Sequence, residues 1–142
     1  MANVGKVAKD KARCNEIISR VKGGGMKFIV PGVVPSKANS YGMGRGNFYK
    51  KQEVKLYEAD FHLQTALVKK HTFDKKDNLF VEYFFYLRNM GQDADNVEKT
   101  VNDCMQKCGI IENDKRIIKH TTTKISDRIN PRVEISIERL KP

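Results

Sequence analysis

Residues 79–103 read LFVEYFFYLRNMGQDADNVEKTVND, and this stretch decides the fold. Its first ten residues are dense in phenylalanine and tyrosine, which is typical of a β-strand. Large apolar side chains occupy both sets of alternating positions, so we predict that Leu79–Arg88 is a strand covered on both sides. The spacing then becomes helical, and Asn96–Cys108 is predicted to be a helix that Gly109 ends. The buried face of this helix would carry Val97, Val101, Cys104 and Cys108.

On the N-terminal side of this stretch we predict a strand, a long loop and a helix. Met26–Val30 is an apolar strand stopped by Pro31-Gly32. A loop rich in Gly, Ser, Asn and basic residues follows, from Val33 to about Lys51. The helix runs from Lys50 to about Lys70. Its apolar stripe consists of Val54, Tyr57, Phe61 and Leu67.

Two further strands are predicted on the C-terminal side, at Arg116–Lys124 and Arg132–Arg139. The second alternates Val133, Ile135 and Ile137 with polar residues, a pattern that is half buried and half solvated. Strands outnumber helices without strict alternation, so the predicted class is α+β, a small mixed sheet with helices packed on it. At 142 residues we expect one domain at 26–142, preceded by a basic extension at 1–25 that is either a mobile tail or a phosphate-binding arm.

Acidic residues gather where the aromatic strand meets the helix. Asp93, Asp95, Asp103 and Asp114 lie within 22 residues of a chain whose net charge is +10. Asp93 and Asp95, two apart in an extended segment, would point the same way, and Asp114 would return to the same edge after the helix. Carboxylates so placed suit Mg²⁺, with Mn²⁺ as a substitute.

The basic remainder of the chain suits a polyanion. Lys and Arg number 27 against 17 Asp and Glu, and the pI is near 9.6. Nucleic acid is the natural partner for such a surface, and no apolar run or lipidation motif predicts a membrane role. Acids that bind a metal on a basic protein therefore predict a metal-dependent nuclease. Lys99 would orient water or neutralise the phosphate, and Asp103 would hold its ammonium group.

A structural explanation of part of the acidic cluster stays open. Asp95 followed by Glu98 matches an N-terminal capping signature, and Lys99 with Asp103 matches a surface ion pair. Neither accounts for Asp93 or Asp114. The segment that starts at Asp93 opens like an EF-hand loop. An EF-hand is excluded because the sixth position is Glu98 and not glycine, and the twelfth is Cys104 and not glutamate.

The long loop combines basic and stacking groups around Gly42-Met-Gly44-Arg-Gly46, which lacks dinucleotide-binding spacing. This mixture suits a branched or unstacked DNA backbone, although such loops are often only solvated. The residues that we expect to contact DNA are Lys37, Asn39, Arg45, Lys50 and Lys51.

Three cysteines and no recognisable secretory leader favour a reducing, cytoplasmic environment. Cys104 and Cys108 lie on one helical face, but a structural zinc needs two more ligands and only scattered histidines are present. We therefore interpret both cysteines as small apolar residues.

The combined motif resembles the RusA family of Holliday junction resolvases. The matching residues are Asp93-x-Asp95-Asn96-x-x-Lys99-x-x-x-Asp103 and Ile110-Ile111-x-x-Asp114. Val30-Pro31-Gly32 and Pro35-Ser36-Lys37-Ala38-Asn39 resemble the family's first strand and loop, so the similarity covers roughly residues 27–139. The family usually has two adjacent acids at the end of the motif, where this chain has Asn113-Asp114.

The resemblance implies a Mg²⁺-dependent homodimer that cuts four-way DNA junctions by paired symmetric nicks, without a small-molecule cofactor. Asp93, Asp95 and Asp114 would be the catalytic metal-binding acids, Lys99 the essential lysine, and Asn96 a supporting residue. A bacterial or phage-infected cell is the implied setting. Two alternatives stay open: an endonuclease selective for flaps or forks, and a junction-binding protein that does not cleave.

Overall fold

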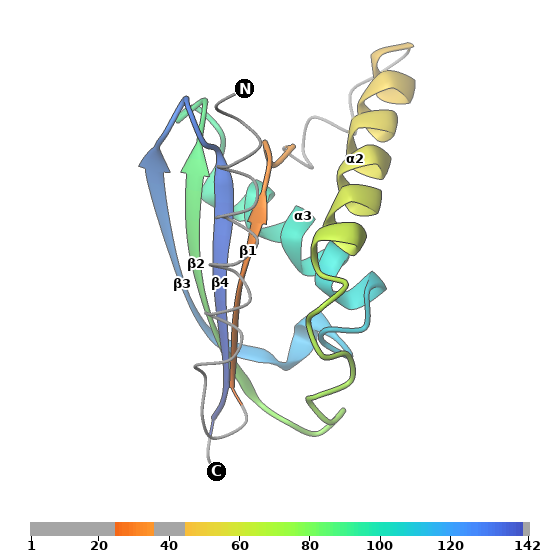
Figure 1. Ribbon diagram of the computed structural model, residues 1–142, viewed down its shortest axis with the longest axis vertical. Helices are drawn as coiled ribbons and strands as arrows, with labels where there is room; N and C mark the ends of the chain where they lie inside the picture. The colour runs from red at the N-terminus through yellow and green to blue at the C-terminus, as the bar shows by residue number, and fades with distance from the viewer. Residues whose placement is uncertain (1–24, 36–44, 141–142) are drawn as a thin grey trace.

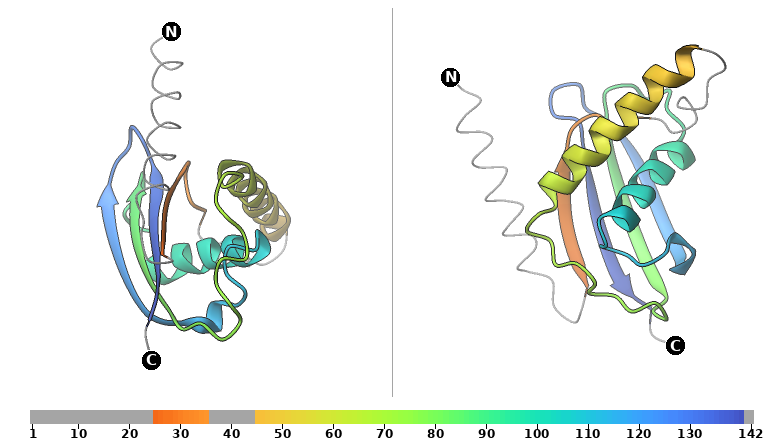
Figure 2. Two further views of the ribbon diagram at one scale, coloured as in Figure 1. Left: turned by 60° about the horizontal axis from the view of Figure 1, so that its bottom comes forward. Right: turned by 90° about the vertical axis from the view of Figure 1, so that its right-hand side faces the viewer.

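The computed structural model describes residues 25–35 and 45–140, and for residues 45–51 only the course of the helix. A four-stranded sheet forms one layer, and two α-helices on the same face form the other (Figures 1 and 2). The elements are β1 (Met26–Pro31), α2 (Arg45–Gln64), β2 (Leu79–Leu87), α3 (Ala94–Lys107), the short 3₁₀ helix η2 (Asp114–Arg116), β3 (Ile117–Ser126) and β4 (Arg132–Arg139). The predicted α+β class is confirmed.

The sheet is mixed, with strand order β1-β4-β2-β3. β4 pairs antiparallel with both β1 and β2, whereas β2 and β3 are parallel. Two parallel neighbouring strands require a crossover connection. Here α3, which follows β2 and precedes β3 in the sequence, supplies the connection and packs on the face of the sheet (Figure 2). This crossover places the acidic segment between the end of β2 and the start of α3.

β2 forms as predicted, but its two faces differ. Leu79, Val81, Tyr83, Phe85 and Leu87 are all buried beneath the helices. The opposite set, Phe80, Phe84 and Tyr86, is only half-buried, and within residues 25–35 and 45–140 no helix packs on it. Cations cover part of that face instead: Lys119 lies 4.9 Å from the centre of the Phe80 ring and Arg132 3.6 Å from that of Tyr86.

α2 begins and ends earlier than predicted. It starts at Arg45, inside the expected loop, and ends at Gln64 rather than near Lys70. Its last turn tightens, because Ala66 N–H donates to Leu63 O and Val68 N–H to Thr65 O, and the Lys70 ammonium group then caps Thr65 O at 3.0 Å. Placing Leu67 in the buried stripe was therefore wrong.

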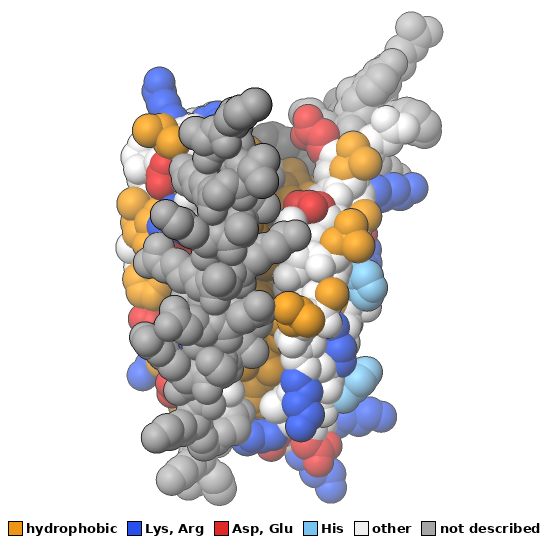
Figure 3. All heavy atoms as spheres, viewed as in Figure 1, with side chains coloured by type: hydrophobic (Ala, Val, Ile, Leu, Met, Phe, Trp, Pro, Cys, Tyr) orange, Lys and Arg blue, Asp and Glu red, His pale blue; other side chains and the backbone are white. Residues whose placement is uncertain are grey.

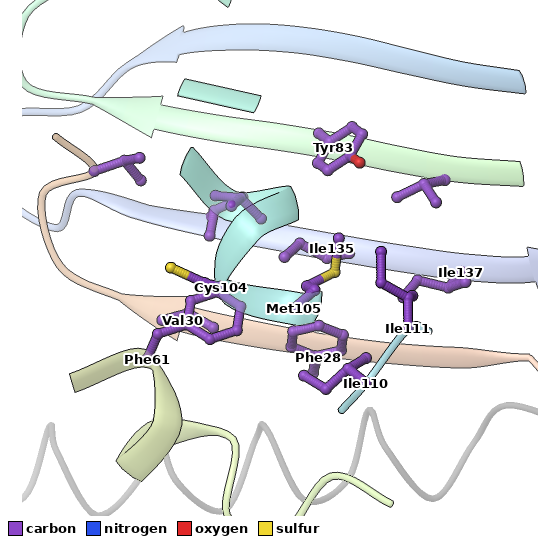
Figure 4. Close-up of a cluster of buried hydrophobic side chains, with 14 of the residues drawn as sticks. Phe28, Val30, Phe61, Tyr83, Cys104, Met105, Ile110, Ile111, Ile135 and Ile137 are labelled. Carbon is purple, nitrogen blue, oxygen red and sulfur yellow. The ribbon is translucent and has the colours of Figure 1, made fainter. Parts of the chain in front are cut away.

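The buried stripe of α2 is Tyr57 and Phe61, extended beyond the helix by Val68, while Leu67 is 71% exposed. Phe61 meets Phe28 of β1 edge to face, with ring centres 6.4 Å apart, close to Val30 and Cys104 (Figure 4). Leu56 and Leu63 of α2 are each 71% exposed, and apolar side chains are visible on the surface of this helix (Figure 3). A narrow apolar contact thus holds a largely solvated helix.

α3 matches its prediction within two residues at each end. Val97, Val101 and Cys104 are buried, Cys108 is partly buried, and Met105 joins the core. Gly109 ends the helix with φ of +77°, where a Cβ would also meet the His71 ring at 3.1 Å. Cys104 in the core behaves as the small apolar residue that we expected.

The two C-terminal strands are confirmed, β4 with its predicted bounds and β3 shifted to Ile117–Ser126. Arg116 belongs to η2, where its guanidinium group donates to the carbonyls of Lys76 and Asp77. Of the helices described, none is both long and apolar enough to cross a membrane. The predicted extension at 1–25 lies outside the described residues, except for Gly25.

Candidate active site

Asp93 and Asp95 lie at the start of α3, but not as a pair on an extended segment. Asp93 is the N-cap residue, with φ −66° and ψ 136°, and Asp95 already belongs to the first helical turn. The expectation that both point the same way from a strand is therefore wrong, because the helix begins at Ala94. Both side chains are exposed, and the partial positive charge of the helix N-terminus favours carboxylates there.

Neither carboxylate has a hydrogen-bond or ion-pair partner among the described residues. The Asp93 side chain makes no capping hydrogen bond, and no ion pair engages Asp95 within the described part of the chain. The capping alternative for Asp95 does not hold, because Asp93 is the N-cap and Glu98 turns toward β3. Both carboxylates are therefore available to a ligand.

The loop before Asp93 is fixed from two sides. The Lys124 ammonium group of β3 donates to Met90 O at 3.1 Å and to Gln92 O at 2.8 Å. The Gln92 side chain donates to Val34 O at 2.9 Å, which ties the same loop to the segment after β1. Sequence reasoning missed Lys124 and Gln92, because their partners are 32 to 58 positions away and no local pattern marks them.

Lys99 is exposed one turn beyond Asp95, which suits a group that approaches a phosphate. The ion pair that we expect between Lys99 and Asp103 stays a prediction. Asp103 is half-buried and has a partner of its own. The Asn96 carbonyl accepts a hydrogen bond from the Thr100 hydroxyl at 3.1 Å within the helix.

Asp114 lies near the opposite end of α3. Its backbone N–H donates to the Gln106 side chain at 3.2 Å, in the last turn of the helix. Asp93 caps the first turn, and a helix of 14 residues spans roughly 20 Å. The backbone of Asp114 is therefore tied to the last turn of α3, and its place beside Asp93 and Asp95 stays a prediction.

The residues described contain no group of three Asp, Glu, His or Cys side chains arranged to hold one metal ion. The donor chemistry nevertheless fits a hard divalent cation at the start of α3, since Asp93 and Asp95 offer exposed carboxylate oxygens without structural partners. Two carboxylates with water are a common form of magnesium coordination in proteins. The participation of Asp114 in such a site stays a prediction from the motif.

The expected DNA-contacting residues are placed only in part. Lys37 and Asn39 lie outside the described residues, and Arg45, Lys50 and Lys51 belong to α2 without described side chains. Thr100 of α3 donates to Pro35 O at 3.0 Å, so the segment that leads to the loop is anchored on the helix that carries the acids.

A hollow of about 590 Å³ lies beside this anchored segment. It is bounded by the residues after β1, by α2 and by the loop after β2, and exposed Arg88 and half-buried Gln92 contribute polar groups to its wall. Gln92 directly precedes the N-cap acid, so the hollow adjoins the candidate site. The wall of the hollow also carries Glu53 and Asp60, so its charge does not by itself favour a phosphate-containing ligand.

A family model described as endodeoxyribonuclease RusA matches residues 31–138, which include every acid discussed above. The chain belongs to the RusA family. No curated protein gives a match to the sequence. Membership assigns this RusA-family chain to the endodeoxyribonucleases, which hydrolyse phosphodiester bonds within DNA.

The position at which this RusA-family chain departs from the usual acid pair has a local role. Asn113 is the N-cap of η2, and its side-chain oxygen accepts from the Lys115 N–H at 2.9 Å. Aspartate and asparagine cap helices about equally well, so the substitution preserves the turn that presents Asp114.

Lys124→Met is expected to slow DNA cleavage at least about tenfold, because the loop before Asp93 loses two hydrogen bonds from a charged donor. Amide hydrogen exchange at residues 90–94 should accelerate in the same variant. Lys119→Met is the matched control, because Lys119 is exposed on the other face of β3. If both variants slowed cleavage equally, the loss of a positive charge would explain the effect, and the hydrogen bonds from Lys124 to the loop would not.

Proposed function

We propose that this RusA-family protein cuts four-way DNA junctions by paired nicks that depend on a divalent metal ion. The observation that carries the proposal is the pair of exposed carboxylates, Asp93 and Asp95, without structural partners at the N-terminus of α3. Such a pair on a chain of net charge +10 suits an enzyme that brings a cation to a polyanion.

Asp93, Asp95 and Asp114 would hold the ion, which is Mg²⁺ or, as a substitute, Mn²⁺. When bound, the metal would polarise the phosphate and lower the pKa of a water molecule. The geometry supports Asp93 and Asp95 for this role, whereas Asp114 is proposed from its place in the family motif. Substituting the acids one at a time tests the geometric argument for Asp93 and Asp95 separately from the motif argument for Asp114.

Other groups of the chain act on the DNA itself. Lys99, which is exposed, would neutralise phosphate charge, Asn96 would support the site and Asp103 would hold the Lys99 ammonium group. The phosphate contacts proposed for the loop and the start of α2 are those of Lys37, Asn39, Arg45, Lys50 and Lys51. Two symmetric cuts call for two equivalent sites, so we propose a homodimer. The proposed setting is the cytoplasm of a bacterial or phage-infected cell.

Synthetic DNA substrates of one sequence test this function. A labelled four-way junction, a flap, a fork and a linear duplex are incubated with the protein and Mg²⁺, and the positions of the cuts are mapped. We expect nicks at symmetric positions in two opposite strands of the junction and intact duplex. Cutting confined to flaps or forks would replace the resolvase by a structure-selective endonuclease. Binding of the junction without cutting in Mg²⁺ or Mn²⁺ would overturn the catalytic proposal.

A further inference from the structure

One buried acid of α3 is not part of the motif. Glu98 is only 7% exposed, and both of its carboxylate oxygens have partners on β3. Its Oε1 lies 2.7 Å from His120 Nδ1, and its Oε2 accepts from the Thr122 hydroxyl at 3.0 Å. Burial raises the pKa of Glu98, whereas the hydrogen bond from Thr122 and the nearby His120 lower it. A carboxylate is costly to bury, and these two partners offset part of that cost.

The arrangement fixes the imidazole ring of His120. The contact of 2.7 Å with Glu98 Oε1 engages His120 Nδ1, so Nε2 is the ring nitrogen left for another ligand. The His120 side chain is 50% exposed, so that nitrogen belongs to a ring that solvent and ligands can reach. Because Glu98 is buried, its contact fixes the orientation of the half-exposed His120 ring more firmly than an ion pair on the surface would.

A second histidine–glutamate pair shows the difference. His71 Nδ1 lies 3.0 Å from Glu112 Oε1, but these side chains are 71% and 29% exposed. The Glu112 side chain is less deeply buried than that of Glu98, which is 9% exposed, and its histidine is largely in solvent, so that pair is a surface contact of the weak kind. In the pair between α3 and β3, by contrast, Glu98 is buried and His120 is half-exposed.

The position of His120 connects it with the candidate active site. Glu98 follows Asp95 by three residues on the same helical face, and the Asp95 charge contributes to raising the Glu98 pKa. On β3, His120, Thr122 and Lys124 alternate toward α3, and Lys124 holds the loop before Asp93. β3 is the outermost strand on this side of the sheet among the described residues, and the half-exposed His120 ring is the member of this row that a DNA strand could contact.

We propose that His120 binds a backbone phosphate of the DNA strand through Nε2, next to the phosphate that is cut, and that Glu98 is its positioning residue. Phosphate recognition uses the imidazolium form, in which Nδ1–H donates to Glu98 and Nε2–H donates to a phosphate oxygen. The inference rests on the proposed function in one respect only, that DNA is the ligand.

The test measures binding of a fluorescent four-way junction over a range of salt concentrations, in EDTA so that no cleavage occurs. His120→Gln should raise Kd about tenfold at low salt and reduce the salt slope by about 1, as expected for one lost phosphate contact. Glu98→Gln should reduce the slope similarly, and the double variant should add little, because both residues serve one contact. His62→Gln, on the exposed side of α2, is the control and should leave Kd and slope unchanged.

The ring signals of His120 give a readout that does not depend on the variants folding. Side-chain ¹H–¹⁵N spectra of the wild-type protein should show a protonated Nδ1 without DNA and a shift of the Nε2 signal on addition of the junction, while His62 stays unchanged. An unperturbed His120 ring, or a His120→Gln variant with wild-type Kd and slope, would overturn this inference alone. Failure of the wild-type protein to bind the junction at all would instead overturn the proposed function.

Discussion

Asp95→Asn is expected to lower the rate of junction cleavage by at least about a hundredfold while Kd for the junction stays within about twofold. The substitution keeps the size of the side chain and removes the negative charge that a metal ion requires. Asp95 is exposed and has no structural partner among the described residues, so the free energy of unfolding should fall by no more than about 1 kcal/mol, from the lost interaction with the helix N-terminus. Cleavage rates at saturating protein, with binding measured in EDTA, separate the two effects.

The same measurement on other acids locates the site. Asp74→Asn, at an exposed position in the loop before β2, is the control and should cleave like wild type. Asp93→Asn should match Asp95→Asn, because both carboxylates lie at the start of α3. A comparable loss in Asp114→Asn would support a three-acid site, and wild-type activity there would reduce the site to two acids. Cleavage retained by Asp95→Asn would remove that residue from the mechanism.

Phe61→Ala is expected to lower the free energy of unfolding by about 3–5 kcal/mol. Phe61 is fully buried, and its ring meets Phe28 edge to face and Tyr57 at 6.1 Å between ring centres. The contact joins α2 to β1, and among the described side chains of α2 the only other buried hydrophobic one is Tyr57. Urea denaturation followed by circular dichroism measures the loss.

Leu63→Ala on the same helix is the matched control, because Leu63 is 71% exposed. Its effect should stay within about 0.5 kcal/mol. Similar losses in both variants would mean that the exposed side of α2 is covered in solution, and the assignment of Phe61 as the anchor of this helix would be wrong.

The strands and α3 could be predicted because their signals are local. β4 alternates strictly, β2 combines aromatic residues with strand spacing, and α3 repeats apolar residues with a glycine at its end. α2 was misplaced because its apolar residues form no clear stripe, and exposed leucines are as frequent as buried aromatics. Tertiary contact with β1, which a local pattern does not encode, selects the buried face.

The sequence identifies the acidic residues of the candidate site, but it does not predict how they are arranged in space. Whether Asp93 lies on a strand or caps a helix depends on the first helical residue, which sequence patterns define only to within a few positions. The turn that carries Asp114 is held by contacts of Asn113 and Gln106, which the motif does not show. Glu98 and Lys124 are positioned by contacts between α3 and β3 that no short motif contains.

A supercoiled plasmid with an extruded cruciform tests the central claim most directly, because it separates paired nicks from single ones. With Mg²⁺, the wild-type protein should convert the plasmid mainly to linear DNA, whose two cuts lie opposite each other in the cruciform. With EDTA, or with Asp95→Asn, the plasmid should stay supercoiled. Linear product in EDTA, or wild-type protein with Mg²⁺ that leaves the plasmid supercoiled, would contradict a metal-dependent junction nuclease in which Asp95 is catalytic.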